Sequence, residues 1–245
     1  MGHKEMENKF LSDFYQDIID FGGLDHAINE ALKNVGSNLK AAPSVEWPFF
    51  SYIEYKERFS QIMLAKNERL YSVDLWCEGI CYGSWWLKDL IQVAAFIKYS
   101  IELQLSVKEL RKLFTWFDSE KGKLHEKGAK KETKQGWKDK INWLEKETTT
   151  LKYLLPCVKI AKGFKELAVL FPYTSMNTLC FSLTTGFPYV TIGPQITAWE
   201  EYIEVKFGEN EYKKLYSTKE LKEYMKQNIV SYGIARQGTA DSIGY

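Results

Sequence analysis

Hydrophobic residues recur along the chain with two different periods, and the switches between them mark the expected elements. Apolar residues at helical spacing predict one helix that ends at Gly22-Gly23 and a second over 27–35. Strand-type runs follow at 51–55, 59–65 and 70–76. Their polar spacers and half-polar alternation predict an antiparallel meander with one buried face.

The middle of the chain switches to helical spacing. Gly83-Ser84 reads as a helix start, because apolar residues follow at steps of four and three from Trp86 onward. Ser106 and Glu109 form a capping-box pattern before a second apolar stripe that reaches Phe117. The two helices are expected to form a helical hairpin.

A charged stretch and a narrow apolar seam come next. Residues 118–134 are rich in lysine and almost free of apolar side chains, which is typical of a solvated linker or loop. Docking of an acidic partner is the alternative interpretation of these lysines. From Trp137 to Leu155 apolar residues again repeat at steps of four and three, so one long helix is predicted before Pro156.

The C-terminal part is predicted to form a second β-region. Its expected elements are, in order, a turn at 171–175, a strand at 178–183, a turn at 186–189, strands at 189–196, 202–207 and 214–216, and a hairpin turn at 208–210. Ser217 and Glu220 repeat the capping-box pattern and open a last helix. The Gly-rich residues after it are expected to form a flexible tail.

These elements predict an α+β protein with antiparallel sheet regions flanked by helices, arranged either as one body or as two halves. The expected parts are N-terminal helices, β-meander and helical hairpin in 1–117, a charged linker in 118–134, a long helix with the C-terminal β-region and helix in 135–230, and a flexible tail in 231–245. A chain of 245 residues is long enough to bury a sizeable core in one domain or two.

Composition and charge narrow the class of protein. The formal net charge of +1 argues against a nucleic-acid binder, which usually carries a basic surplus. The most apolar window, 80–99, contains Lys88 and Asp89 and is therefore not expected to span a membrane. The polar N-terminus and four cysteines without a secretory leader favour a cytoplasmic protein. No cofactor is predicted, and no metal site, since no histidine lies near a cysteine in the sequence.

Signatures of the common enzymes are missing from the sequence. It has no Gly-rich nucleotide loop, no nucleophile elbow and no His-Glu-x-x-His helix. A triad assembled in space remains open, with Tyr173, Thr174, Ser175 or Cys180 meeting His26 or a carboxylate. The alternative for Thr174-Ser175 is hydrogen bonding within a turn. Two acidic groups, Asp74 with Glu78 and Glu200-Glu201 with Glu204, are possible acid/base pairs or inert surface charges.

An aromatic group in the first half is the more attractive candidate site. Trp76, Tyr82, Trp85 and Trp86 lie close together in the sequence, and tryptophan and tyrosine are enriched both in ligand pockets and at interface hot spots. Burial in the core is the competing interpretation.

The segment 170–189, LFPYTSMNTLCFSLTTGFPY, resembles the C-terminal signature of a domain family of unknown function whose members are often labelled natural-product biosynthesis proteins. The residues that carry the resemblance are Phe171, Pro172, Thr174, Ser175, Leu179, Phe181, Ser182, Thr185, Gly186, Pro188 and Tyr189. Members often have an Arg-Cys pair where this chain has Leu183-Thr184. The resemblance implies a shared fold unit.

Two functions follow as hypotheses. The first is a non-catalytic cytosolic interaction protein, of the immunity or accessory type, which binds a protein partner through an aromatic and charged surface. The second is a biosynthetic enzyme or small-molecule binder of a natural-product pathway that uses the aromatic group together with Tyr173 or Ser175. A pocket that holds an ionisable group with a shifted pKa would favour the second hypothesis.

Overall fold

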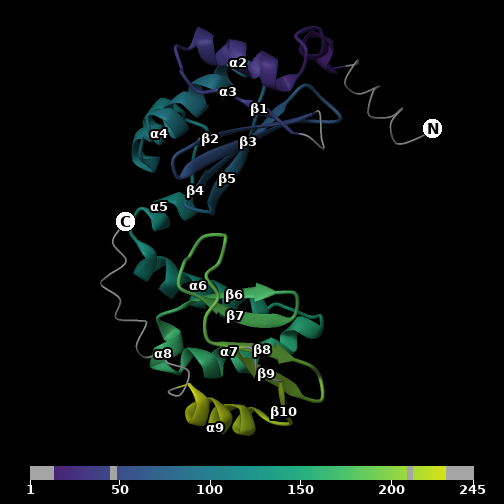
Figure 1. The fold of residues 1–245 in the computed structure, drawn as a ribbon, viewed down its shortest axis with the longest axis vertical. Helices are drawn as coiled ribbons and strands as arrows, with labels where there is room; N and C mark the ends of the chain where they lie inside the picture. Colours follow the sequence, from purple (N-terminus) through teal and green to yellow (C-terminus); the bar gives the residue numbers. More distant parts are fainter. Residues whose placement is uncertain (1–13, 45–48, 209–211, 230–245) are drawn as a thin grey trace, which may run out of the picture. The chain divides into compact units, whose positions relative to one another are not determined.

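The computed structural model describes residues 14–44, 49–208 and 212–229. The chain divides into two compact units, here called unit 1 (1–126) and unit 2 (127–245). Each unit contains a five-stranded antiparallel sheet and its own helices (Figure 1). The predicted α+β fold class is therefore confirmed. Within the described residues, no helix has the length and apolar character needed to cross a membrane.

Unit 1 is a meander whose strands follow one another in sequence order. Its strands are β1 (Ala42–Pro43), β2 (Phe50–Tyr55), β3 (Arg58–Leu64), β4 (Tyr71–Cys77) and β5 (Ile80–Leu87). Its helices are α2 (Leu24–Asn34), α3 (Leu90–Ile97), a π-helical segment (Lys98–Glu102), α4 (Val107–Leu113) and α5 (Glu120–His125). Residues 14–20 are also helical. In Figure 1, α2, α3 and α4 lie together on one side of this sheet.

The core of unit 1 lies between these helices and the inner face of the sheet. Alternate strand residues such as Ile62, Val73 and Leu75 are fully buried there, as period-two alternation requires. Trp85 and Phe96 meet at 5.6 Å between ring centroids, so aromatic rings from β5 and α3 join the two layers. The predicted meander and the helix over 27–35 are confirmed.

The expected helix start at Gly83-Ser84 is wrong. Trp85 and Trp86 belong to β5, and α3 begins only at Leu90, where the Asp89 carboxylate accepts a hydrogen bond from the Ile91 amide. The hairpin before β5 turns at Glu78 and Gly79, which both have positive φ, as a tight turn between twisted strands requires. That turn places the following residues in register with β4, and this pairing overrides the helical spacing.

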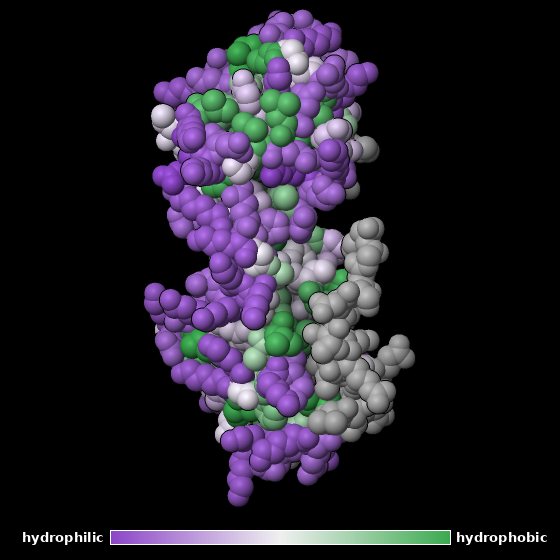
Figure 2. Space-filling model, turned by 90° about the vertical axis from the view of Figure 1, so that its left-hand side faces the viewer, coloured by the Kyte–Doolittle hydropathy of each residue, from purple (hydrophilic) through white to green (hydrophobic). Residues whose placement is uncertain are grey.

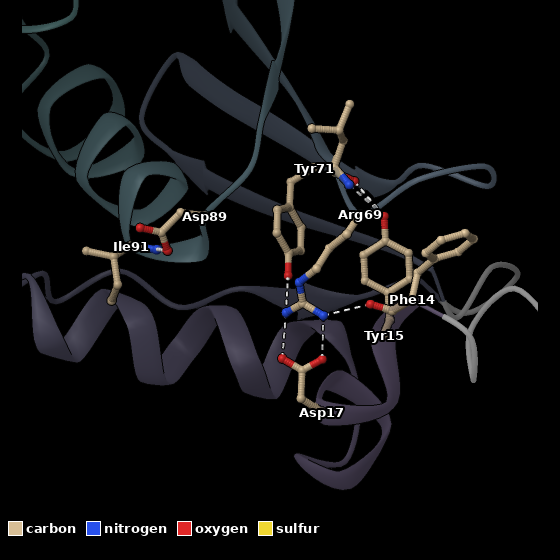
Figure 3. A network of polar contacts seen from close by, with 8 residues as sticks. Phe14, Tyr15, Asp17, Arg69, Tyr71, Asp89 and Ile91 are labelled. Carbon is tan, nitrogen blue, oxygen red and sulfur yellow. Dashed lines mark hydrogen bonds and ion pairs between the residues drawn. The ribbon is translucent and has the colours of Figure 1, made fainter.

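A polar cluster joins the N-terminal helical residues to the β3–β4 turn (Figure 3). The Arg69 guanidinium donates to both oxygens of Asp17 and to the Phe14 carbonyl. Tyr15 is fully buried. Its hydroxyl donates a hydrogen bond to the Leu70 carbonyl at 2.8 Å and accepts one from the Leu70 amide. A buried hydroxyl with such partners costs about 1–3 kcal/mol when it is left unpaired, so this cluster fixes how the first helix packs.

The charged stretch 118–134 is a solvated connector only in part. Its residues 126–131 are exposed and contain the boundary between the two units, but α5 and the beginning of the next helix also lie within the stretch. Ser119 is buried, accepts from the Gly122 amide and donates to the Tyr82 carbonyl at 2.6 Å. A Cβ on Gly122 would lie 2.7 Å from side-chain atoms of Tyr82 and Val107. One face of this lysine-rich segment is therefore packed closely against the sheet.

Unit 2 has the strand order β10-β9-β8-β7-β6, so β6 is an edge strand. Its strands are β6 (Phe171–Ser175), β7 (Thr178–Ser182), β8 (Pro194–Ala198), β9 (Ile203–Phe207) and β10 (Lys213–Leu215). Its helices are α6 (Ala129–Leu144), a 3₁₀ turn (Thr150–Tyr153), α7 (Leu154–Lys162), α8 (Lys165–Ala168) and α9 (Thr218–Asn228). Buried residues of α6, α7 and α9 share one core with Leu179, Phe181 and Val205 of the sheet.

The single long helix predicted up to Pro156 is wrong. The helix α6 ends at Leu144, and the Glu147 carboxylate accepts from the backbone amides of Thr148 and Thr149, which turns the chain. Local bonding of this kind competes with helical bonding, and threonine is a poor helix former. Pro156 lies in the first turn of α7, where its missing N–H costs nothing.

The other C-terminal predictions have mixed outcomes. The expected turn at 171–175 is strand β6, and the turn follows it at Met176-Asn177. The strands expected near 178–183, 202–207 and 214–216 are confirmed, whereas the run at 189–196 becomes a strand only from Pro194. Ser106 and Ser217 cap α4 and α9 as predicted. Residues 209 and 210 and the tail 231–245 lie outside the described residues.

Candidate functional site

A groove of about 360 Å³ lies in unit 2, where α6 passes the edge strand β6. Its lining comes from α6, β6 and the loop after β7, namely Gly136, Asp139, Lys140, Trp143, Phe171, Pro172, Tyr173, Thr174 and Tyr189. Five of these residues belong to the segment 170–189. The segment that carries the family resemblance therefore forms one side of a cavity.

Close packing of α6 on β6 sets the width of this groove. A Cβ on Gly136 would lie 2.7 Å from the ring of Phe171. Nearby, the buried Trp137 indole donates to the Leu170 carbonyl at 3.0 Å. Because no side chain stands between α6 and β6 at Gly136, the Phe171 ring reaches the helix backbone.

Three aromatic rings form one wall. The ring of Tyr189 stacks on Tyr173 with 4.2 Å between centroids and an interplanar angle of 20°, and on Phe171 at 6.0 Å and 22°. Phe187 meets Tyr189 edge-on at 6.1 Å. Burial raises the pKa of both Tyr173 and Tyr189, so their hydroxyls stay neutral at physiological pH. The wall is flat, uncharged and half-buried.

Hydroxyl groups hold the loop that carries Tyr189. The Thr184 hydroxyl contacts Ser182 at 3.1 Å, accepts from the Val190 amide at 3.2 Å and lies 3.2 Å from the Gly186 carbonyl. Thr185 donates to the buried carboxylate of Glu132 on α6 at 2.6 Å. The Thr184 side chain therefore organises this loop.

The opposite side of the groove carries an amine. The Lys140 ammonium donates to Thr174 Oγ1 at 3.0 Å and lies 4.9 Å from the centroid of the Trp143 ring. Burial lowers the pKa of Lys140. Among the described residues, no carboxylate lies within 4.0 Å of this nitrogen. The groove thus combines a flat aromatic wall with an ammonium that has no acidic partner.

Of the candidate residues named from the sequence, Tyr173 and Thr174 line this groove. Ser175 is exposed at the end of β6, and among the described contacts no histidine meets it. His26 belongs to unit 1 and lies 3.8 Å from Asp25. The hypothesis of a serine triad gains no support from this arrangement.

The four aromatic residues predicted in unit 1 do not share one site. Trp85 packs on Phe96, and Tyr82 is buried beside His125 at 5.8 Å between ring centroids. Trp76 and Trp86 lie on the outer face of the sheet, where Trp76 stacks on Phe59 at 5.3 Å and Trp86 is 51% exposed. Trp86 also borders an apolar pocket of about 380 Å³ with Phe49, Met63 and Lys66.

The polar contacts of the Cys77 thiol in unit 1 were not predicted from the sequence. Burial opposes ionisation of Cys77, but hydrogen bonds with His125, Tyr82 and Arg58 outweigh it and lower the pKa of Cys77. The Glu78 carboxylate lies 3.6 Å from Nε2 of His125, so Glu78 pairs with this histidine rather than with Asp74. The described residues contain no group of three ligands arranged to hold a metal ion.

Sequence reasoning missed Lys140, Trp143 and the pairing of Tyr189 with Tyr173. The two Phe-Pro-Tyr triplets, at 171–173 and 187–189, were the available signal, because their tyrosines are the two stacked rings. For Lys140 the sequence offers no comparable signal, since the residue stands among charged neighbours on a helix.

In comparisons with known proteins, no family model, no curated protein and no solved structure matches this chain. The resemblance of 170–189 to the biosynthesis-associated family stays a prediction.

Proposed function

We propose that the protein is a small-molecule-binding protein whose ligand-binding site is the groove of unit 2. The observation that carries the proposal is the open cavity lined by stacked aromatic rings and an unpaired ammonium. Ligand pockets typically combine apolar and aromatic walls with a few polar groups that orient the ligand. A planar molecule fits such a wall by stacking.

This proposal favours the second of the two sequence hypotheses. A role in a natural-product pathway, as binder or enzyme, rests on the family resemblance of the same segment. The groove supplies a site for such a molecule but no assembled set of catalytic groups. We therefore propose binding as its function. Free thiols on all four cysteines support a reducing, cytoplasmic location.

The test is a titration with a neutral planar probe, 2-naphthamide, followed by NMR of the full-length protein. We expect shifts at the groove residues and about two- to tenfold weaker binding by a Tyr189→Ala variant, because a stacked ring pair contributes about 0.5–1.5 kcal/mol. Tyr216→Ala removes an exposed tyrosine outside the groove and should bind like the parent. Equal affinity of the flat probe and cyclohexanecarboxamide would contradict recognition by stacking.

A second candidate is the interaction protein of the immunity or accessory type, with its partner on the outer face of the unit 1 sheet. The favouring observation is the exposure of Trp86 (51%) and Tyr52 (46%) on that face, which among the described residues of unit 1 lies opposite the helix-covered face. On the part of the surface drawn in Figure 2, hydrophilic residues dominate and hydrophobic ones gather in smaller patches. Tryptophan and tyrosine are enriched at interface hot spots, so their exposure on this face favours a partner there.

This candidate is tested by capture of partners on the immobilised protein. A stoichiometric partner that binds the parent and Trp199→Ala, but not Trp86→Ala, would support it, because both variants remove an exposed indole. Trp85 is unsuited to the experiment, since its removal would open the core. Capture that survives Trp86→Ala would exclude this face as the binding surface.

A further inference from the structure

Two of the polar groups that line the unit 2 groove are hydrogen-bond donors placed side by side. Lys140 Nζ and Thr174 Oγ1 are 3.0 Å apart, and the amine donates to the hydroxyl. An ammonium has three N–H donors, so two stay available, and the Thr174 hydroxyl hydrogen is free to donate as well. A pair of neighbouring donors matches the two oxygens of one carboxylate.

The positive charge of Lys140 in the groove also favours an anionic ligand. The Lys140 ammonium is partly removed from water, yet its only polar contact in the described residues is a neutral hydroxyl. Burial of a cation without a counter-ion is unfavourable. An incoming carboxylate supplies the missing charge at the place where solvent has been removed.

One acidic residue lines the same groove and limits the net attraction. Asp139 is the helical neighbour of Lys140, and its carboxylate accepts from Gln135 at 2.7 Å. With one cation and one acid, the groove suits a single negative charge better than the two of a phosphate monoester. Phosphate sites often use arginine, and no arginine is among the residues that line this groove.

We propose that the ligand of the groove is an aromatic carboxylate, with its ring on the Tyr173–Tyr189 wall and its carboxylate on Lys140 Nζ and the Thr174 hydroxyl. This inference rests on the proposed small-molecule site and names the chemical class that it takes. Lys140 and Thr174 are binding residues in it, and no covalent step is involved.

The experiment compares three probes by calorimetry with the full-length protein: 2-naphthoate, the neutral 2-naphthamide and the non-aromatic cyclohexanecarboxylate. We expect 2-naphthoate to bind at least about tenfold more tightly than 2-naphthamide, because a hydrogen bond to a charged group contributes more than a neutral one. Cyclohexanecarboxylate should bind more weakly than 2-naphthoate, since it cannot stack.

Variants of Lys140 and Asp139 show which side chain causes the preference for 2-naphthoate over 2-naphthamide. Lys140→Met should weaken 2-naphthoate binding far more than 2-naphthamide binding and so remove the preference for the acid, while Lys140→Arg keeps most of the preference. Asp139→Asn should tighten 2-naphthoate binding more than 2-naphthamide binding. Thermal melts of each variant establish that it is folded.

The two proposals fail in different ways. If the acid and the amide bind the parent equally, or Lys140→Met keeps the preference, the carboxylate inference is wrong while the small-molecule site stands. If none of the probes binds the parent, both proposals are wrong.

Discussion

At the scale of single residues, Lys140 is the most consequential position. It is a partly buried cation that contacts a hydroxyl and an indole but no acid among the described residues. Such a residue is a cost to the fold and is typical of a binding site, where stability is exchanged for affinity. The same atom that we propose to bind the ligand should therefore weaken the unliganded protein.

Replacement of Lys140 by methionine should raise the free energy of unfolding at pH 7 by about 0.5–2 kcal/mol, because the change removes a desolvated charge and keeps the volume. Since burial lowers the pKa of Lys140 in the folded state, the unfolded chain binds more protons between the two pKa values. The penalty in the parent is thus complete below the folded pKa and fades as the pH rises toward about 10.4.

Urea unfolding at pH 7 and at pH 10 measures both effects. The advantage of Lys140→Met should shrink at the higher pH, and Lys138→Met, on an exposed position of the same helix, should change little. A less stable Lys140→Met variant would show that the ammonium stabilises the fold and would remove the argument from an unpaired charge.

At the scale of elements, the lysine-rich helix α5 shows how packing overrides composition. Its charged residues face water, but Ser119 and Gly122 are buried against the sheet. Arg111 and Lys123 lie near Asp118, yet all three are partly exposed, so these pairs contribute little to stability. The stability of α5 therefore depends on its close contact at Gly122.

The change Gly122→Ala should lower the free energy of unfolding by about 1 kcal/mol. Overpacking against the buried rings and methyls costs about 1–3 kcal/mol, and the better helix propensity of alanine recovers up to about 1 kcal/mol. A solvated helix would instead gain stability from this change. Urea unfolding measures the sign of the effect, and a gain in stability would contradict close packing at Gly122. Lys121→Ala, on the exposed face, is the matched control and should be nearly neutral.

The scale of elements also explains what the sequence could and could not predict. Strands β2 to β4 and helices α2 and α9 were predictable, because alternation and capping act locally. Trp85 and Trp86 were misassigned to a helix, since their strand depends on the hairpin at Glu78-Gly79 and on pairing with β4. The helix past Trp137 was predicted too long, because an apolar seam continues across the turn at Glu147.

The same limits apply to the candidate site. Tyr173 was identified because it stands in an unusual aromatic triplet. Lys140 was not, since its burial is created by Thr174 and Trp143 and not by its own neighbours in the sequence. Trp85 was overvalued, because nothing local distinguishes a core tryptophan from one in a pocket.

At the scale of the whole molecule, the two candidate surfaces belong to different units. All residues that line the groove come from unit 2, and the exposed aromatic face comes from the sheet of unit 1. Substitutions that abolish one function are therefore not expected to disturb the side chains of the other. Loss of both by one substitution would indicate unfolding.

The contact between the Lys140 ammonium and the Trp143 indole gives the protein a built-in optical probe. Indole emission depends on nearby charge, and Trp143 is 40% exposed with a cation 4.9 Å from its ring centroid. An occupant that draws this cation away changes the emission of Trp143, one of the eight tryptophans of the chain. The groove can therefore be observed in the native chain, without attaching a dye.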